Sequence, residues 1–364
     1  MKNTIKILAI LLASLMLLTA CKTTVDKSED KKIEEKKETT EAKTETKTEE
    51  LSEEEAWKKE PAYGKTFKIG YNGGLCTGGP GIAKALGMFD EVGVDVELVK
   101  TDSTVGTVDL VGTNKVQMVT NHISAMTVPA VNGVNMVFKK GVQTGCKSLY
   151  VLKDGPIKST KDLVGKSVGL PNGIGNSDHN IALRFMNHDG IEPKDIIWKP
   201  VESSASILAL QNGEIDSVIL SDQFAEKFMQ DGTLEVIRSL TWDDDFKKEA
   251  CCIYAFNKDF AEENPITVKK VTEALFKMSD YVEHNIEDAT QVLFDNNWAS
   301  GDFDQAVRMM RSYDWQVTND MTEATLRDIL KDYKKFGVIT SDKSAEELLS
   351  ELWAPEDFKH DNEK

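Results

Sequence analysis

The sequence predicts an α/β protein of two lobes joined by two hinge crossovers and completed by C-terminal helices. Short apolar strands alternate with helical segments in two series, over 67–138 and over 167–238. Such alternation is typical of parallel, right-handed sheets covered by helices. Extended runs near 146–152 and 250–256 join the two series, and after Pro265 the chain becomes helical nearly to its end.

The N-terminus has the features of a targeting segment. Lys2 and Lys6 precede an apolar run at 7–18, which is too short for an ordinary membrane span. The run ends in Leu-Thr-Ala-Cys at 18–21, which resembles the lipobox of bacterial lipoprotein signal peptides. The resemblance implies a signal peptide at 1–20, lipidation of Cys21, and an extracytoplasmic protein anchored to the cell membrane by lipid. A secretory signal with a chance cysteine is the alternative.

Composition changes sharply after the signal. Residues 21–60 are dominated by Lys, Glu, Asp and Thr, which predicts a disordered charged tether, with a short helix at 52–59 as the one exception. We then expect the first part of lobe 1 at 61–150, lobe 2 at 151–248, and a return to lobe 1 with the C-terminal helices at 249–364. The net charge of −17 argues against a nucleic-acid partner, and we expect a monomer.

Five loops at strand ends are the expected ligand site. In the stretch 165–187, a strand is followed by a glycine-bearing loop and by a helix that begins near Ser177 or Asp178. Such a helix presents free backbone N–H groups and a positive dipole end. The other loops are 72–79, 101–104, 120–123 and 221–223, and ligands of open parallel sheets sit at the carboxyl ends of strands. The candidate ligand-binding residues in these loops are Asn72, Gly73, Gly74, Asp102, Ser103, Asn121, His122, Asn172, Asn176, Ser177, His179 and Asp222.

Four segments taken together resemble a known family: 86–96, 158–169, 208–216 and 257–265. In order and spacing they are similar to segments of the substrate-binding proteins of ABC importers, in the group that serves nitrate, taurine, aliphatic sulfonates and thiamine-pyrimidine precursors. The resemblance spans roughly 66–335. It implies a periplasmic-binding-protein-like fold, a small-molecule ligand held in an interlobe cleft, an ABC permease and ATPase as partners, and no cofactor.

Two ligand classes compete. The family favours a sulfonate, taurine or nitrate-type anion held by backbone N–H groups. The predicted loops, however, contain no Arg or Lys; they carry Asp102, Asp178 and Asp222, which would repel an anion or pair with an amine. With His122 and His179 against a ring, a thiamine-pyrimidine or other heteroaromatic precursor is the alternative. A structural or adhesion lipoprotein on the same fold is the third hypothesis.

The remaining cysteines are Cys76, Cys146, Cys251 and Cys252. A disulfide between Cys146 and the adjacent pair is sterically feasible, and burial on the hinge strands is the simpler interpretation. Their spacing shows no metal-binding pattern, so no metal site is expected. The pair resembles the cysteine run of pyrimidine-synthesis enzymes related to the family, but only two cysteines adjoin here. We therefore expect no catalytic residues and no enzymatic activity; Ser177, Asp178 and His179 point to different helix faces and form no triad.

Overall fold

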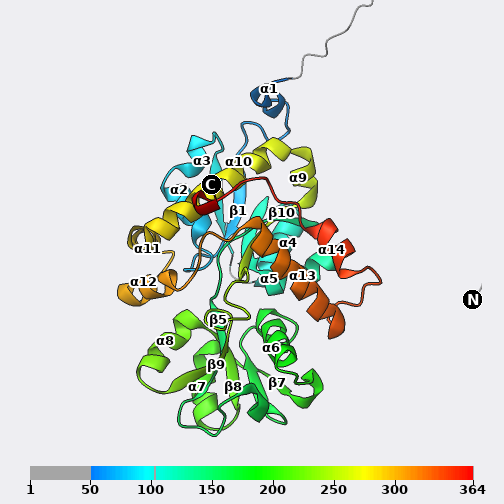
Figure 1. Cartoon of the computed structure of the whole chain (residues 1–364). Coiled ribbons are helices and arrows are strands. Elements are labelled where there is room, and N and C mark those ends of the chain that lie inside the picture. The colour runs from blue at the N-terminus through cyan, green and yellow to red at the C-terminus, as the bar shows by residue number, and fades with distance from the viewer. Residues whose placement is uncertain (1–50, 102–103, 364) are drawn as a thin grey trace, which may run out of the picture. The chain divides into compact units, whose positions relative to one another are not determined.

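The computed structural model describes residues 51–101 and 104–363 (Figure 1). The expected signal peptide, Cys21, most of the expected tether, Asp102 and Ser103 lie outside these residues. Residues from Leu51 onward belong to one compact unit. Among the described residues, no helix combines the length and the apolar character that crossing a membrane requires.

The first lobe is built on a five-stranded sheet with the strand order β2-β1-β3-β10-β4. Strand β1 is parallel to β2 and to the central strand β3, whereas β10 is antiparallel to β3 and β4. The expected parallel series is therefore present in β1 to β4, and β10 is the exception. The reason is that β10 enters this sheet on the chain's return from the second lobe and so runs the opposite way. The strands are β1 Phe67–Tyr71, β2 Val96–Lys100, β3 Met118–His122, β4 Met136–Gly141 and β10 Cys252–Asn257.

The second lobe repeats this plan with the order β7-β6-β8-β5-β9. Here β6 is parallel to β7 and β8, and β5 is antiparallel to β8 and β9. The strand β5 lies wholly in this sheet, so the second sheet takes in residues from Lys147 to Ser239. Its strands are β5 Lys147–Leu152, β6 Ser167–Leu170, β7 Ile197–Pro200, β8 Ser217–Ser221 and β9 Leu234–Ser239.

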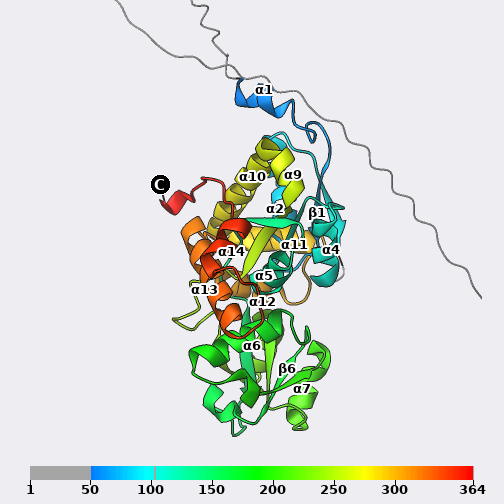
Figure 2. The same ribbon diagram turned by 90° about the vertical axis from the view of Figure 1, so that its right-hand side faces the viewer.

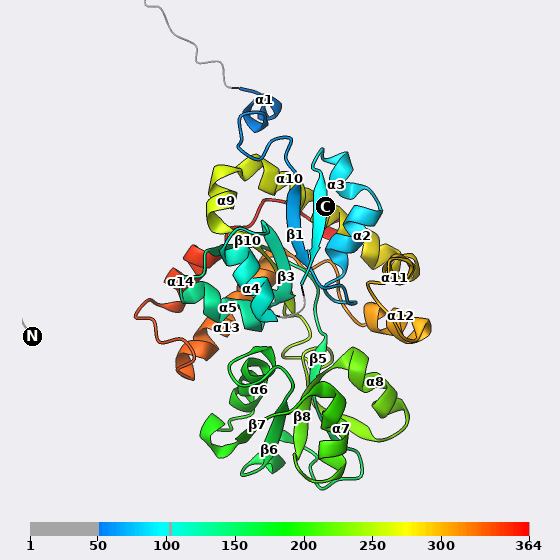
Figure 3. The ribbon, with the colours of Figure 1, turned by 180° about the vertical axis from the view of Figure 1, so that it is seen from behind.

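Helices cover the sheets of both lobes, as Figures 1, 2 and 3 show from three sides. Those of the first lobe before the crossover are α2 Gly79–Ala85, α3 Met88–Glu91, α4 Thr104–Gly112 and α5 Ile123–Val131. Those of the second lobe are α6 Ser177–His188, α7 Ser203–Gln211 and α8 Asp222–Gln230. The C-terminal helices are α9 Lys258–Glu263, α10 Pro265–His284, α11 Ile286–Asp295, α12 Phe303–Arg311, α13 Asn319–Lys335 and α14 Ala345–Leu352. Short 3₁₀ turns lie at Thr160–Leu163, Pro193–Asp195 and Asp361–Glu363.

A short helix, α1 Glu53–Trp57, begins the described body. Ser52 and Glu55 form a capping box that satisfies its first N–H groups. Trp57 is buried, and its indole N–H donates to Thr267 Oγ1 at 2.9 Å. A short helix is thus present within the segment 52–59, and the indole of its Trp57 is anchored on α10.

Each lobe has its own core on both faces of its sheet. In the first lobe, one cluster contains Ile69, Tyr254 and Leu275, and the other contains Val119, Ile253 and Leu330. Tyr254 and Ile253 are neighbours in β10, and successive side chains of a strand point to opposite faces. The second lobe shows the same division around β5, with Leu149 in one cluster and Tyr150 in the other.

Two crossovers connect the lobes, at 142–146 between β4 and β5 and at 240–251 between β9 and β10. They pair with each other: Thr144 and Ala250 form an antiparallel bridge, and the N–H of Cys251 donates to the carbonyl of Gln143 at 2.7 Å. The two-lobed fold with two hinge crossovers is therefore confirmed, with the crossovers lying side by side.

Candidate functional site

Four of the five expected loops meet at two consecutive residues, Cys146 and Lys147, where the first crossover enters β5. The loop 72–79 reaches this point through Cys76, and the end of β3 through His122. The loop 171–179 reaches it through Asp178, which forms an ion pair with Lys147. The loop 221–223 reaches it through the N–H of Asp222, which donates to the carbonyl of Cys146 at 3.0 Å. The fifth loop, 101–104, is described only at its ends.

The backbone at this junction is strained. Cys146 has a φ of 91°, in the left-handed region that favours glycine, and it follows Gly145 with a φ of 80°. A β-carbon at Gly145 would lie 2.9 Å from Thr241 Oγ1, so only glycine fits there. A non-glycine residue in this region costs about 1–3 kcal/mol and persists where its surroundings determine it, most often at functional sites. Here the N–H of Cys146 is held by Thr241 Oγ1 at 2.9 Å.

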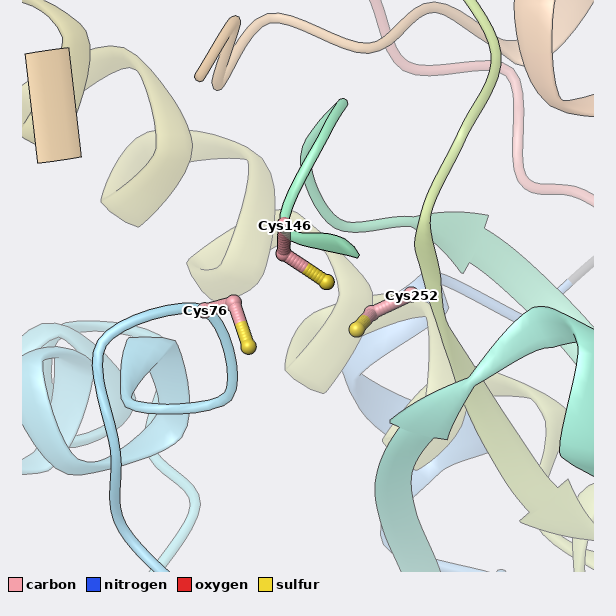
Figure 4. A group of neighbouring side chains, drawn as sticks. All are labelled: Cys76, Cys146 and Cys252. Atoms are coloured by element: carbon pink, nitrogen blue, oxygen red, sulfur yellow. The ribbon is translucent and has the colours of Figure 1, made fainter. Parts of the chain in front are cut away.

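Thiols from three segments gather around Cys146 (Figure 4). The sulfurs of Cys76, Cys146 and Cys252 all lie within 4.8 Å of one another. The sulfur of Cys251 lies 2.6 Å from that of Cys146, and all four cysteines are free thiols in the structure. Cys146, Cys251 and Cys252 are buried, and Cys76 is half-buried. The sequence spacing contained no signal for this convergence, because the residues are brought together only by the crossovers.

The imidazole of His122 faces these thiols. Its Nε2 lies 3.2 Å from the sulfur of Cys251 and 3.7 Å from that of Cys146, and its Nδ1 contacts Ser124 Oγ at 3.0 Å. Burial lowers its pKa to about 4, so the ring is neutral at physiological pH. We expected His122 to contact a ring of the ligand. In the structure, both nitrogens of its imidazole already have neighbours within the protein.

Lys147 places a basic residue beside the loops, which themselves contain no Arg or Lys, and it pairs with Asp178, a carboxylate expected to repel an anion or pair with an amine. The lysine comes from β5, outside the loops considered in the sequence, and its ammonium group contacts Asp178 Oδ1. Burial would lower the pKa of Lys147, but the carboxylate of Asp178 outweighs burial and raises it, so the ammonium stays charged. Asp178 also accepts from the N–H of Asn172 at 2.7 Å and from its Nδ2 at 3.2 Å. Its charge is therefore balanced within the protein.

The N-terminus of α6 is close to the expected one. Asn176 rather than Ser177 or Asp178 is the N-cap, and its side chain accepts from the N–H of Ser177 at 2.7 Å. Ser177 Oγ accepts from Asn172 Nδ2 at 3.0 Å. His179 packs edge-on against Trp198, with ring centroids 4.8 Å apart, and its Nδ1 accepts from Gly175 N–H at 3.2 Å. Burial lowers the pKa of His179, and its buried Nε2 has no partner among the described residues.

Asp222 begins α8 and is fully buried. Its carboxylate accepts from the Tyr150 hydroxyl at 2.6 Å and from the hydroxyl of Thr241. Burial raises its pKa, opposed by these two donors. The carboxylate supports the crossover, because Thr241 also holds the N–H of Cys146.

Before Cys76, the loop after β1 lines a pocket and packs closely on the backbone of Trp298. Asn72 is exposed, and it lines with Gly73 a pocket of about 760 Å³ at the edge strand β2. Gly73 has a φ of 71°, and a β-carbon there would lie 2.6 Å from the carbonyl oxygen of Trp298, which accepts from Gly74 N–H at 2.7 Å. Asn121, at the end of β3, accepts from the N–H of His122 at 2.7 Å.

Buried polar atoms without a partner mark residues that the sequence analysis missed. Among the described residues these include both amide atoms of Gln143, Oδ1 of Asn180, and the hydroxyls of Thr120 and Tyr254. Gln143 lies in the first crossover, three residues before Cys146. Asn180 lies in α6, and its Nδ2 donates across the lobes to the carbonyl of Ser124 at 2.9 Å. Their residue types are common in loops and helices, so only burial distinguishes them.

The two lobes contact each other on both sides of the crossovers (Figures 1 and 3). On one side α6 packs on α5 and α13, with Arg184 donating to Asp332 at 2.9 Å; on the other, α8 packs on α12, with Arg308 donating to Glu226 at 2.9 Å. A cavity lined by both lobes, between His122 and Arg184, has a volume of about 10 Å³. That is the size of a single water site, so a solute needs the lobes to separate there.

Comparison with known proteins agrees with this fold. The family model described as NMT1/THI5 like matches residues 79–289, more than half of the chain, and the chain belongs to this family. No curated protein sequence matches the chain.

Solved structures similar to this chain include three periplasmic binding proteins. The alkanesulfonate-binding protein SsuA from Xanthomonas axonopodis pv. citri, bound to MOPS, has a TM-score of 0.62 at 13% identity, covering 81% of this chain and 99% of that one. The aliphatic sulphonate binding protein SsuA from Escherichia coli has a TM-score of 0.64 at 15% identity, covering 81% and 94%. The nitrate-binding protein NrtA from Synechocystis PCC 6803 has a TM-score of 0.64 at 14% identity, covering 79% and 85%.

Proposed function

We propose that this protein is the extracytoplasmic solute-binding lipoprotein of an ABC importer. It captures a small polar solute between its lobes, closes on it, and delivers it to a permease and ATPase in the membrane. The lipid on Cys21 holds it at the cell surface, and no chemistry is performed on the solute. The observation that carries the proposal is the convergence of strand-end loops from both lobes at Cys146 and Lys147. Hinged two-lobed proteins close around ligands at such places.

Unpartnered buried groups support a polar solute. A buried amide group without a hydrogen-bond partner lowers the stability of the protein by about 1–3 kcal/mol. Such a group is retained where a ligand or a water molecule supplies the missing hydrogen bond. Gln143 in the crossover and Asn180 in α6 each have such an atom. They lie on the crossover and on the interlobe face of α6, where a solute between the lobes would be recognised.

The charges favour an anion, of the sulfonate, taurine or nitrate type, over a heteroaromatic amine. Asp178 is paired with Lys147, and Asp222 accepts from Tyr150, so neither carboxylate awaits an amine. His122 and His179 have thiols and an indole as neighbours. Because the pair of Lys147 and Asp178 is neutral as a whole, the N-terminus of α6 beside it supplies the positive potential that favours an anion.

A ligand panel tests the proposal on the full chain, with thermal shift confirmed by calorimetry. The panel contains taurine, an alkanesulfonate, nitrate and an aminopyrimidine. We expect stabilisation by one or more of the anions, with Asp178→Asn strengthening their binding because it frees Lys147, and Lys147→Met weakening it. Binding of the aminopyrimidine alone would select the heteroaromatic alternative. Stabilisation by no compound would overturn both ligand classes and favour the structural lipoprotein.

A further inference from the structure

We propose that Cys76, Cys146 and Cys252 form a binding site for a soft metal ion, Cu(I) or Zn(II). This site goes beyond solute capture and does not depend on which solute the protein binds. The three sulfurs come from the loop after β1, the first crossover and the start of β10 (Figure 4). Thiolates select these ions over harder divalent cations such as Mg²⁺ and Ca²⁺.

The distances between the sulfurs suit such an ion. A Zn–S bond is about 2.3 Å, so sulfurs that share one ion in trigonal or tetrahedral geometry lie ~4 Å apart. The sulfurs of Cys76, Cys146 and Cys252 all lie within 4.8 Å of one another. Binding therefore needs only a small inward movement of the side chains, without rearrangement of the strands.

Cys146, the middle cysteine of the proposed site, has a strained backbone conformation. The sulfur of Cys146 reaches both Cys76 and Cys252 from a residue with a φ of 91°, a conformation that a cysteine rarely adopts. An ordinary buried cysteine on a hinge strand would gain nothing from this strain. The strain is independent of the sulfur positions and points to the same site.

Access to the site also fits a metal ion. Cys76 is half-buried whereas Cys146 and Cys252 are buried, so the ion reaches the site from the side of the loop 72–79.

A second group, formed by His122, Cys146 and Cys251, competes for Cys146. The sulfur of Cys251 lies 2.6 Å from that of Cys146, and oxidation of this pair would remove Cys146 from the proposed site. Cys251 and Cys252 are neighbours at the start of β10, but only Cys252 belongs to the group with Cys76, and only Cys251 to the group with His122. The two groups are thus separable by substitution of adjacent residues.

The test uses the full chain, purified from membranes under reducing, anaerobic conditions. It is loaded with Zn(II), with Cu(I) against a competing chelator, or with Co(II) as a spectroscopic probe. We expect one ion per chain and thiolate-to-cobalt charge-transfer bands. Cys76→Ser and Cys252→Ser should each weaken binding about 100-fold or more, because removal of a second-shell partner alone costs 10–100-fold. Cys251→Ser, at the neighbouring position, should leave binding within a few-fold of the unsubstituted chain.

Circular dichroism and melting of each variant separate loss of a ligand from loss of the fold. Cys76→Ser is the decisive variant, since Cys76 is half-buried and its substitution leaves both crossovers intact. Three results would overturn the proposal: no binding of any of these ions, binding that needs Cys251 and His122 but not Cys76, or a disulfide between Cys146 and Cys251 in protein isolated without reductant.

Discussion

Gln143 is a buried residue of the first crossover whose side-chain amide has no hydrogen-bond partner among the described residues. It is fully buried, and neither its amide nitrogen nor its amide oxygen has a partner among the described residues. Its backbone carbonyl, in contrast, accepts from the N–H of Cys251 at 2.7 Å. The backbone of this residue thus maintains the hinge, whereas its side chain adds a cost that only a bound polar group or water removes.

Replacement of Gln143 by Met tests whether the side-chain amide, unlike the backbone, lowers the stability of the solute-free protein. Met has a similar volume and no strong polar atoms, so we expect Gln143→Met to raise the free energy of unfolding of the solute-free protein by about 1 kcal/mol. The same change should abolish stabilisation by the solute. Urea unfolding with and without solute measures both effects.

Gln316 provides the matched control. It is also buried, but its Nε2 donates to Asp280 Oδ1 at 3.0 Å and to Asp361. Gln316→Met should therefore destabilise the protein and leave the solute-induced shift unchanged. If both substitutions destabilise the solute-free protein equally, the side chain of Gln143 has no special role.

His188 gives a residue-scale prediction about pH. A hydrogen bond with Asp332 raises its pKa above 6.5, opposed by burial and by Arg184, and Asp245 lies 3.5 Å from its Nδ1. A raised pKa in the folded state stabilises the protein fully below pH 6.5, and this contribution is lost as the pH rises through the folded value. We expect the stability of the protein to fall over this window in chemical unfolding, and His188→Gln to reduce the slope. An unchanged slope would show that His188 does not titrate with folding.

Helix α6 combines two functions on two faces of one element. Its N-terminus presents Asn176 and Ser177 beside the pair of Lys147 and Asp178, while its middle presents Arg184 to the first lobe. Arg184 is almost fully buried in spite of its charge. Two carboxylates neutralise it, so α6 couples the solute loop to the interlobe contact.

Loss of Arg184 should therefore be costly. It donates to Glu249 at 2.8 Å and to Asp332 at 2.9 Å, and both carboxylates are largely buried. Arg184→Gln would leave Glu249 without its cationic partner and Asp332 with only His188 and Asn187, and we expect a loss of about 3 kcal/mol in the free energy of unfolding. Arg311→Gln is the control, because Arg311 and its partner Glu287 are mostly exposed and such pairs contribute at most about 1 kcal/mol. Equal losses would contradict the role of Arg184.

Elements were more predictable than the contacts between them. The loop and helix around Ser177 could be expected because N-capping residues and apolar periodicity are local signals. The antiparallel entry of β10 could not, since strand direction depends on where the chain returns from the other lobe. Lys147 was missed for the same reason: it lies in a strand, and only the crossover places it beside Asp178. The convergence of Cys76 with Cys146 and Cys252 likewise joins segments far apart in the sequence.

At the scale of the whole molecule, the two crossovers are both the hinge and the centre of the site. Cys146 and Lys147 lie in one crossover and its strand, Cys251 ends the other crossover, and Cys252 begins β10. Rotation of the lobes therefore moves the residues that would contact the solute. On the proposed function, binding and closure would be coupled, because the same residues would take part in both.

Separation of the lobes should govern how fast the solute binds. The cavity between His122 and Arg184 is too small to contain a solute. For a solute to enter between the lobes there, the contacts between the lobes must open first. One of them, between Arg308 in α12 and Glu226 in α8, has an arginine side chain that is 47% exposed, so its loss leaves both lobes folded. We expect Arg308→Gln to increase both the association and the dissociation rate of the solute, because it stabilises the open state relative to the closed one. Stopped-flow binding measures the rates, and small-angle scattering of solute-free protein should show a more open average form. Unchanged rates together with unchanged scattering would mean that α8 and α12 do not restrain the lobes.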